Sequence, residues 1–416
     1  MQHSRALHVT FTCLLLTACA SEDEGGAEFL VQDSAGVSIF ELTVDPWLDG
    51  TAWHLSASPL TQIGVQAGDS AHELYGVNRA HRLSDGSIAV SSSTTNDIRI
   101  FDARGGLARR IGRSGEGPGE FKGLGGFEVL PDDTLLAVDL GRHALTAFAA
   151  DGSFSWTRSF ATGSCSWIAE EWPVRFRLPD GRVLIVCEDS DLRSRMQSGQ
   201  VPIGSTARST ALVLAFPATD ASADTIHSLP GIEYGIIDAG QGPGTMYPPF
   251  GRRVVYALTG NGLFIGNQER FEVREYSSNG NLQSIVRGPN TDLAITPADL
   301  DDLRRALMLN TPTDDPAATQ FIEQYLSTYP RPQNRPAYGR ILVDAAGRLW
   351  ISEYYHQFET PVRWAILDFD ERNAASLTVP ERFEIYDVGV DYVLGRWRDE
   401  IGVEYVQLYA LQQASS

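Results

Sequence analysis

The sequence predicts an all-β fold that is built from repeated hairpins. The first observation is a turn signal, rich in Asp, Asn and Gly, that separates two apolar runs and occurs five times. Residues of these types tolerate the positive φ angles that tight hairpins need, so each copy indicates two antiparallel strands. The five turns are Arg82–Gly86, Val129–Asp133, Arg177–Gly181, Leu258–Gly262 and Val343–Gly347.

The second observation is that another turn follows each of the first ones. These turns are Asp102–Gly106, Ala149–Gly152, Ala218–Ala223, Ser277–Gly280 and Asp370–Asn373. Each unit therefore holds two hairpins, which make the four-stranded antiparallel sheet of a propeller blade. The first two units are spaced by about 47 residues, which suits a blade.

A sixth unit is predicted at the C-terminal end. Its three strands are expected at Arg382–Val388, Tyr392–Trp397 and Val403–Ala410, so a fourth strand is missing. We expect Trp53–Ile63 to supply it, because an open ring would leave an exposed sheet edge. The prediction is a six-bladed β-propeller over residues 36–411.

A glycine-rich run, Gly112–Phe121, lies between the first two units, and a more divergent copy of it lies at Ala239–Met246. Together with the turns, these runs resemble six-bladed propellers of the NHL-repeat-like kind, which are common among bacterial exported proteins. The resemblance covers roughly residues 53–411 and implies a fold rather than one activity. A phosphate loop is excluded at Gly115–Gly119, since no helix start and no Lys-Ser/Thr pair follow it.

Two segments interrupt the strand pattern. Asp191–Ser209 is polar and is expected to be a surface loop. Residues 296–329 predict a small helical insertion between blades four and five, because Thr296–Asp299 has the cap, proline and acid of a helix start. Apolar residues then recur at helical spacing, and a second helix is expected at Pro316–Tyr329. The insertion is either a structural cover of one propeller face or a lid or partner-docking element.

The first 18 residues are expected to be a signal peptide. Arg5 precedes the apolar run Ala6–Leu16, which is too short to span a bilayer. The run ends in Leu16–Cys19, which resembles the lipobox of bacterial lipoproteins. The resemblance implies cleavage before Cys19 and a diacylglycerol on its sulfur. The alternative is an ordinary signal peptide with an incidental cysteine.

Lipidation at Cys19 would place the protein in the bacterial cell envelope. Residues 19–35, which begin with a small and acidic segment, are expected to be a flexible tether. The periplasmic or surface face is implied, and the outer membrane is favoured because Ala20 replaces the Asp that resembles an inner-membrane retention signal. The net charge of −20 argues against nucleic acid as a partner.

Two cysteines remain for the body of the protein, Cys165 and Cys187. Cys165 precedes the first strand of the third unit, and Cys187 follows its second strand. Both cysteines are therefore expected at the same end of that hairpin. A disulfide between them is predicted, since disulfides persist outside the cytoplasm. A reactive thiol is the alternative.

Ligands of propellers bind at the mouth of the central channel. Residues leading into the predicted inner strands are the candidates, namely Asn78, Arg79, His81, Glu128, Arg175, Arg253 and Arg340. Arginine recurs among them although the chain is acidic. These arginines either hold an anionic ligand or pair with carboxylates such as Glu128 and Asp85.

The chemistry of the site is less well defined by the sequence. No two histidines have metal-ligand spacing, and no catalytic residue or cofactor is predicted. Calcium is a weak expectation from Glu128 and Asn78. The favoured function is a binding or scaffold module for an envelope protein or a small ligand. The alternatives are a metal-dependent lactonase, lyase or sugar dehydrogenase, and a carbohydrate-binding lipoprotein whose tryptophans contact sugar.

Overall fold

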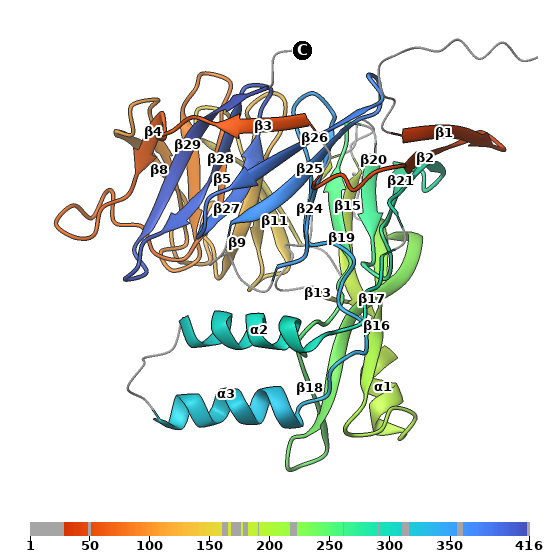
Figure 1. Ribbon diagram of the computed structural model, residues 1–416. Coiled ribbons are helices and arrows are strands. Elements are labelled where there is room, and N and C mark those ends of the chain that lie inside the picture. The colour runs from red at the N-terminus through yellow and green to blue at the C-terminus, as the bar shows by residue number, and fades with distance from the viewer. Residues whose placement is uncertain are drawn as a thin grey trace, which may run out of the picture.

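The fold is a six-bladed β-propeller with few short helices, as the sequence predicts (Figure 1). The computed structural model describes residues 29–48, 51–159, 182–189, 191–216, 223–260, 262–289, 291–309, 316–355 and 361–413, with the backbone alone at 165–167, 176–177 and 309. The predicted signal peptide and Cys19 lie outside the described residues.

Blades one and two are regular four-stranded antiparallel sheets. Blade one contains β5 (Val77–Arg82), β6 (Ile88–Ser92), β7 (Asp97–Phe101) and β8 (Leu107–Ile111). Blade two contains β9 (Leu124–Val129), β10 (Leu135–Asp139), β11 (Ala144–Phe148) and β12 (Phe154–Ser159). The Gly112–Phe121 run joins them as a linker, and the Phe121 ring is buried in the core between the two blades.

Blade three is longer than the sequence suggests. Its strands are β13 (Cys165–Trp167), β14 (Phe176–Arg177), β15 (Val183–Asp189), β16 (Thr206–Phe216), β17 (Asp224–Asp238) and β18 (Pro243–Met246). The expected loop Asp191–Ser209 is wrong, because it contains α1 (Asp191–Gln197) and the start of β16. Leu192 and Met196 of α1 are buried against Ile236, and this apolar contact orders the segment.

Blades four and five flank the helical insertion. Blade four contains β19 (Val255–Leu258), β20 (Gly262–Gly266), β21 (Glu272–Ser277) and β22 (Leu282–Arg287). Blade five contains β23 (Ile341–Val343), β24 (Leu349–Ser352), β25 (Val362–Asp368) and β26 (Asn373–Val379). Between them lie α2 (Pro297–Leu309) and α3 (Pro316–Thr328), which confirms both predicted helices.

Blade six closes the ring with an N-terminal strand. Its own strands are β27 (Phe383–Val388), β28 (Tyr392–Arg398) and β29 (Glu404–Gln412). The segment expected to complete it forms two strands: β4 (Thr61–Ile63) pairs antiparallel with β29, as predicted. The other strand, β3 (Thr51–Leu55), runs parallel to β26 and also meets the end of β29, so it joins blades five and six.

The described chain begins with a hairpin of β1 (Phe29–Ser34) and β2 (Val37–Leu42), and β2 runs parallel to β22 of blade four. Strand β1 therefore occupies part of the expected tether 19–35. The Phe29 and Phe40 rings, 6.0 Å apart, pack against blades four and five, and burial of this apolar surface accounts for the strand. Figure 1 shows this hairpin away from α2 and α3.

The repeated turns share one hydrogen-bond pattern, in which an aspartate side chain accepts bonds from backbone amides of its own turn. In the β7–β8 turn, Asp102 Oδ1 accepts hydrogen bonds from the amides of Arg104 (2.8 Å) and Gly106 (2.9 Å). In the β23–β24 turn, Asp344 Oδ1 accepts from Ala346 (2.9 Å) and Arg348 (3.0 Å). A glycine with positive φ, 87° at Gly105 and 84° at Gly347, completes each turn. The Asp and Gly signals of the sequence therefore have a direct structural cause.

Candidate functional site

A cavity of about 630 Å³ extends along the central channel. It is lined by the inner strands β5, β9, β19, β23 and β27 and by the connections that lead into them. Six predicted candidates line it together: Asn78, Arg79, His81, Glu128, Arg253 and Arg340. The seventh, Arg175, lies outside the described residues. The structure therefore brings these six residues together in one cavity, and their role in binding a ligand stays a prediction.

The helical insertion covers one end of this cavity. Leu303 and Leu307 of α2 and Tyr325 of α3 are part of its lining. The helices pack on Phe250 and Tyr354 of the propeller, and Tyr325 Oη donates a hydrogen bond to the carbonyl of Tyr247 (3.1 Å). Figure 1 shows α2 nearer to the blades than α3. The insertion is therefore a cover over the channel mouth.

The start of α2 has the predicted capping arrangement. Thr296 Oγ1 accepts from the amide of Asp299 (3.3 Å), and Asp299 Oδ2 accepts from the amide of Thr296 (2.7 Å). On α3, Phe321 is 58% exposed. The buried positions of α3 are Ile322 and Leu326, and Phe321 instead stacks on Tyr325.

Charged groups on blades one, two and six meet inside the cavity. Arg79 Nη2 lies 2.5 Å from Glu128 Oε1. His81 lies between two carboxylates, with Nε2 3.4 Å from Glu128 Oε2 and Nδ1 3.8 Å from Asp387 Oδ1. Burial alone would lower the pKa of His81, but the two carboxylates raise it to about 9. The imidazole is therefore a cation at neutral pH.

Asp387 was not predicted from the sequence. Burial acts to raise its pKa, but His81, the amide of Arg82 and the Tyr392 hydroxyl lower the pKa below its ordinary value. Asp387 Oδ2 accepts from the Arg82 amide and from Tyr392 Oη, both at 2.9 Å. Asp387 is therefore an ionised carboxylate in the wall of the cavity.

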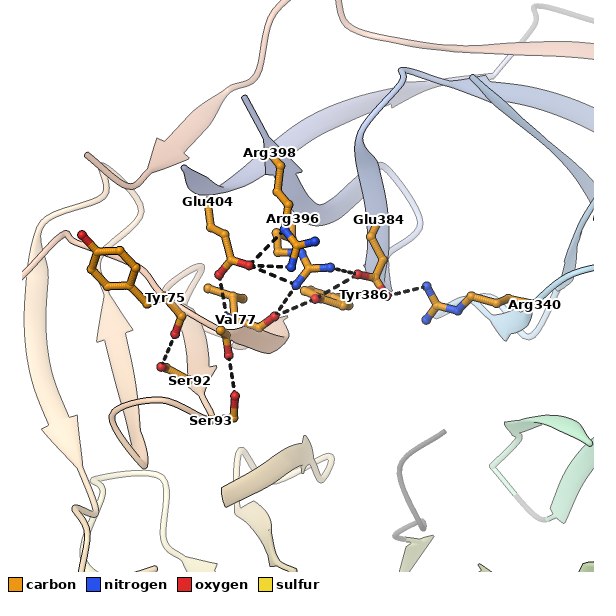
Figure 2. Close-up of polar contacts among 11 residues, drawn as sticks. Tyr75, Val77, Ser92, Ser93, Arg340, Glu384, Tyr386, Arg396, Arg398 and Glu404 are labelled. Carbon is orange, nitrogen blue, oxygen red and sulfur yellow. Dashed lines mark hydrogen bonds and ion pairs between the residues drawn. The ribbon is translucent and has the colours of Figure 1, made fainter. Parts of the chain in front are cut away.

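Blade five reaches blade six through Arg340. Its Nη1 lies 3.3 Å from Glu384 Oε1 and donates to the carbonyl of Ile385 (3.1 Å). Figure 2 shows that Glu384 also binds Arg396, whose Nη2 lies 2.5 Å from Glu384 Oε2. Arg340 is thus one end of a network that continues away from the cavity to the seam between blades six and one.

Arg253 is positioned through its backbone. Its amide donates to Gln268 Oε1 (2.7 Å), and Gln268 Nε2 donates to the carbonyls of Tyr338 and Gly339, both at 3.0 Å. Gln268 is buried and has a positive φ of 62°, which is uncommon for a residue other than glycine. The Arg253 guanidinium lies over the Tyr247 ring, 5.1 Å from its centroid. Gln268 therefore fixes the spacing between Arg253 and the residue before Arg340.

The alternative that the cavity arginines pair with carboxylates such as Glu128 and Asp85 is confirmed only in part. Glu128 is a partner as expected, but Asp85 is not, since it caps its own turn through the Ser87 amide. The Asn78 side chain is hydrogen-bonded at both ends, because its Oδ1 accepts from Ser91 and its Nδ2 donates to the carbonyl of Leu124. Within the part of the chain that the structure describes, no three His, Cys, Asp or Glu side chains are grouped to hold a metal.

Sequence reasoning missed the carboxylates of blade six and the tyrosines of the cavity. Glu384 is the second residue of β27, and Asp387 is near its end, so both sit on an inner strand as Arg79 and Glu128 do. Six tyrosines line the cavity: Tyr247, Tyr256, Tyr325, Tyr354, Tyr355 and Tyr386. An alignment of blade six with the other inner strands would have marked its two acids.

The tryptophans considered as sugar contacts belong to the apolar core. Trp350 is fully buried, and its ring lies 6.3 Å from that of Trp53. Trp397 packs in the same cluster and against Tyr405. None of the three lines the cavity. Trp350 is therefore a core residue, and Trp53 and Trp397 are partly buried against that core.

The structure describes only one of the two cysteines of the predicted disulfide with its side chain. Cys187 is disulfide-bonded, and its strand β15 pairs with β13, which contains Cys165. The side chain of Cys165 lies outside the described residues, so the pairing of Cys165 with Cys187 stays a prediction.

Comparison with known proteins supports the fold. The family DUF5128, described as a 6-bladed beta-propeller, matches residues 76–171. A DUF4221 family member from Bacteroides vulgatus is 12% identical, with 88% of this chain and 100% of that chain covered and a TM-score of 0.51. No curated protein matches the chain. These likenesses are to propellers and identify no activity.

Two further solved structures are less similar in shape. A Bacteroides fragilis protein, described provisionally as exported, is 13% identical over 91% of this chain and 99% of its own, with a TM-score of 0.45. A gluconolactonase from Xanthomonas campestris is 12% identical over 86% of this chain and 100% of its own, with a TM-score of 0.38. With TM-scores below 0.5, neither carries an argument about function.

Proposed function

We propose that this protein is a ligand-binding module of the bacterial cell envelope, which is held at a membrane by lipid on Cys19 and binds a small molecule in its channel. The observation that carries the proposal is the covered cavity of about 630 Å³, a volume typical of small-molecule sites. Its lining mixes apolar side chains, tyrosines and charged groups, which is also typical of such sites.

The charged groups of the cavity favour binding over catalysis. A general base must be unprotonated near neutral pH, whereas the pKa of His81 is raised to about 9. Glu128 and Asp387 are engaged with this cation, and Glu384 is engaged with Arg340 and Arg396. A metal ion would have to compete with these arginine and histidine charges for the carboxylates. The alternative of a metal-dependent enzyme is therefore less well supported than binding.

The cavity is tested by filling it. Leu258 lines the cavity, so Leu258→Trp should reduce the space for a ligand. After dialysis against an extract of the producing bacterium, the unchanged protein should retain a small molecule that Leu258→Trp does not. Liquid chromatography with mass spectrometry measures the retained molecules.

The matched control is Ile401→Trp, because Ile401 is 70% exposed and lies outside the cavity lining. It should retain the same molecule as the unchanged protein. Equal retention by all three proteins, or retention by none, would remove the cavity as a ligand site.

The lipid anchor is tested separately. Cys19→Ser removes the sulfur to which the lipid would be joined, so the protein should move from the membrane fraction to the soluble fraction. Immunoblotting of the two fractions measures this shift, with Cys13→Ser as the control that should stay at the membrane. A Cys19→Ser protein that remains fully membrane-bound would contradict lipidation at this residue.

A further inference from the structure

The charge of the cavity differs from that of the chain. The protein carries a net charge of −20, yet the ionisable lining consists of Arg79, His81, Arg253 and Arg340 against Glu128, Glu384 and Asp387. With His81 protonated, cations outnumber carboxylates. The lining of the cavity therefore has a small excess of positive charge in an otherwise acidic protein.

The three arginines come from blades four, five and one, and all three line the cavity. Arg253 precedes the inner strand of blade four, Arg340 precedes that of blade five, and Arg79 lies in that of blade one. Gln268 bridges the backbone of Arg253 and that of Gly339, as described above. The backbone positions of Arg253 and of the residue before Arg340 are thus held at a fixed spacing by Gln268.

Two of these arginines are close enough to repel each other. Burial and the charge of Arg340 both act to lower the pKa of Arg79, and Glu128 more than offsets them. Glu128 is the one hydrogen-bond partner that the described residues give to the Arg79 guanidinium, and the buried Nε is left without one. An acceptor bound beside Arg79 would neutralise this repulsion and supply bonds that a guanidinium prefers to make.

The tyrosines of the cavity indicate which kind of uncharged group a bound anion would carry. Tyr247, Tyr325 and Tyr354 lie at the covered end with Leu303 and Leu307. Aromatic faces pack on rings, and phenolic hydroxyls bond to polar substituents. The covered end, where the Arg253 guanidinium lies over Tyr247, therefore suits a ring-bearing body that carries an oxyanion.

We propose that the ligand is a small organic oxyanion, a carboxylate or a phosphate, whose charged head lies among Arg79, Arg253 and Arg340 and whose ring-bearing body lies against the tyrosines under α2 and α3. This inference rests on the proposed function and names the chemical class of its ligand.

The test compares three probes of similar size by isothermal titration calorimetry at constant ionic strength: phenyl phosphate, benzoate and benzyl alcohol. At least one anion should bind at one site, and benzyl alcohol should bind about tenfold more weakly or not at all, since it cannot make charge-assisted hydrogen bonds to the guanidinium groups. The stronger of the two anions tells whether the head is a phosphate or a carboxylate.

Substitutions locate the binding. Arg253→Gln keeps the backbone bond to Gln268 and should weaken anion binding about tenfold. Arg340→Lys keeps a charge facing Glu384 but loses the planar fork, and it should weaken binding as well. Arg113→Gln is the control, since this side chain is 79% exposed, and it should bind as the unchanged protein does.

Three results would overturn the inference: no binding of either anion, equal binding of benzyl alcohol, or anion binding that persists in Arg253→Gln, Arg340→Lys and the cavity-filling Leu258→Trp. A neutral molecule retained from the bacterial extract, together with any of these results, would leave the proposed ligand-binding function standing. Failure of that function shows differently, as no retention at all.

Discussion

Replacing Glu404 with alanine should lower the free energy of unfolding by about 3–5 kcal/mol, the usual cost of breaking a buried ion pair from one side. Its Oε1 accepts from Arg396 (3.2 Å) and Arg398 (2.8 Å), and its Oε2 accepts from the Val77 amide (2.7 Å). Figure 2 shows these contacts at the seam where blade six meets blade one.

The size of this effect follows from burial. The Glu404 side chain is only 7% exposed, and that of Arg396 is 12% exposed. Without Glu404, the Arg396 charge would keep only the Glu384 carboxylate, and the Val77 amide would lose its acceptor. Both groups lie where the ring closes, so the loss should weaken closure itself.

Denaturant unfolding followed by circular dichroism measures this change. Glu400→Ala is the matched control, because Glu400 is exposed in the turn between β28 and β29, and it should stay near the unchanged stability. Equal stability of Glu404→Ala and Glu400→Ala would mean that β4 and β3 close the ring without the charge network.

Glu128→Gln should have the second large effect. The amide keeps the shape of the side chain but removes the charge that faces both Arg79 and His81. Two buried cations would then lose their shared carboxylate, and we expect a loss of about 3–5 kcal/mol. Thermal and denaturant unfolding measure it, with Glu116→Gln as the control, since Glu116 is 73% exposed and pairs with Lys122.

The same substitution changes how stability depends on pH. The pKa of His81 is raised from 6.5 to about 9, so its proton is bound more tightly in the folded state than in the unfolded state. The stability that protonated His81 adds to the folded state is fully present below pH 6.5 and is lost as the pH rises through 9. In Glu128→Gln the pKa of His81 should fall, so the decrease in stability between these pH values should become shallower.

Denaturant unfolding of the unchanged protein and of Glu128→Gln at several pH values across this range measures the change. Parallel curves would show that Glu128 does not hold the proton on His81. Because both proteins share every titrating group except Glu128, the difference between the curves reports on the effect of this carboxylate.

The propeller was predictable because its turns are local. Asp102 and Gly105, or Asp344 and Gly347, specify a hairpin by bonds within a few residues, so each signal is complete in the sequence. Ring closure was predictable in outline for a different reason, since a blade with three strands needs a fourth. Its division between β3 and β4 depends on contacts with blade five that no local pattern contains.

The site was predictable only where position alone sufficed. Arg79 and Glu128 were named as candidates because they lie on inner strands, and Arg253 and Arg340 because they precede such strands. Asp387 and Gln268 were missed, because their importance comes from partners far away in sequence, His81 for the first and the backbone of Gly339 for the second. Helix α1 was missed because its two apolar residues are few and are buried by the distant strand β17.

Native mass spectrometry of the protein purified from its own bacterium, without added ligand or metal, tests the central claim most directly. The account predicts a population that carries one small molecule, which is present in the unchanged protein and in Ile401→Trp but is absent from Leu258→Trp. The molecule should be released on mild activation and detected as a negative ion. The same bound mass in all three proteins would place the ligand outside the channel and contradict the account.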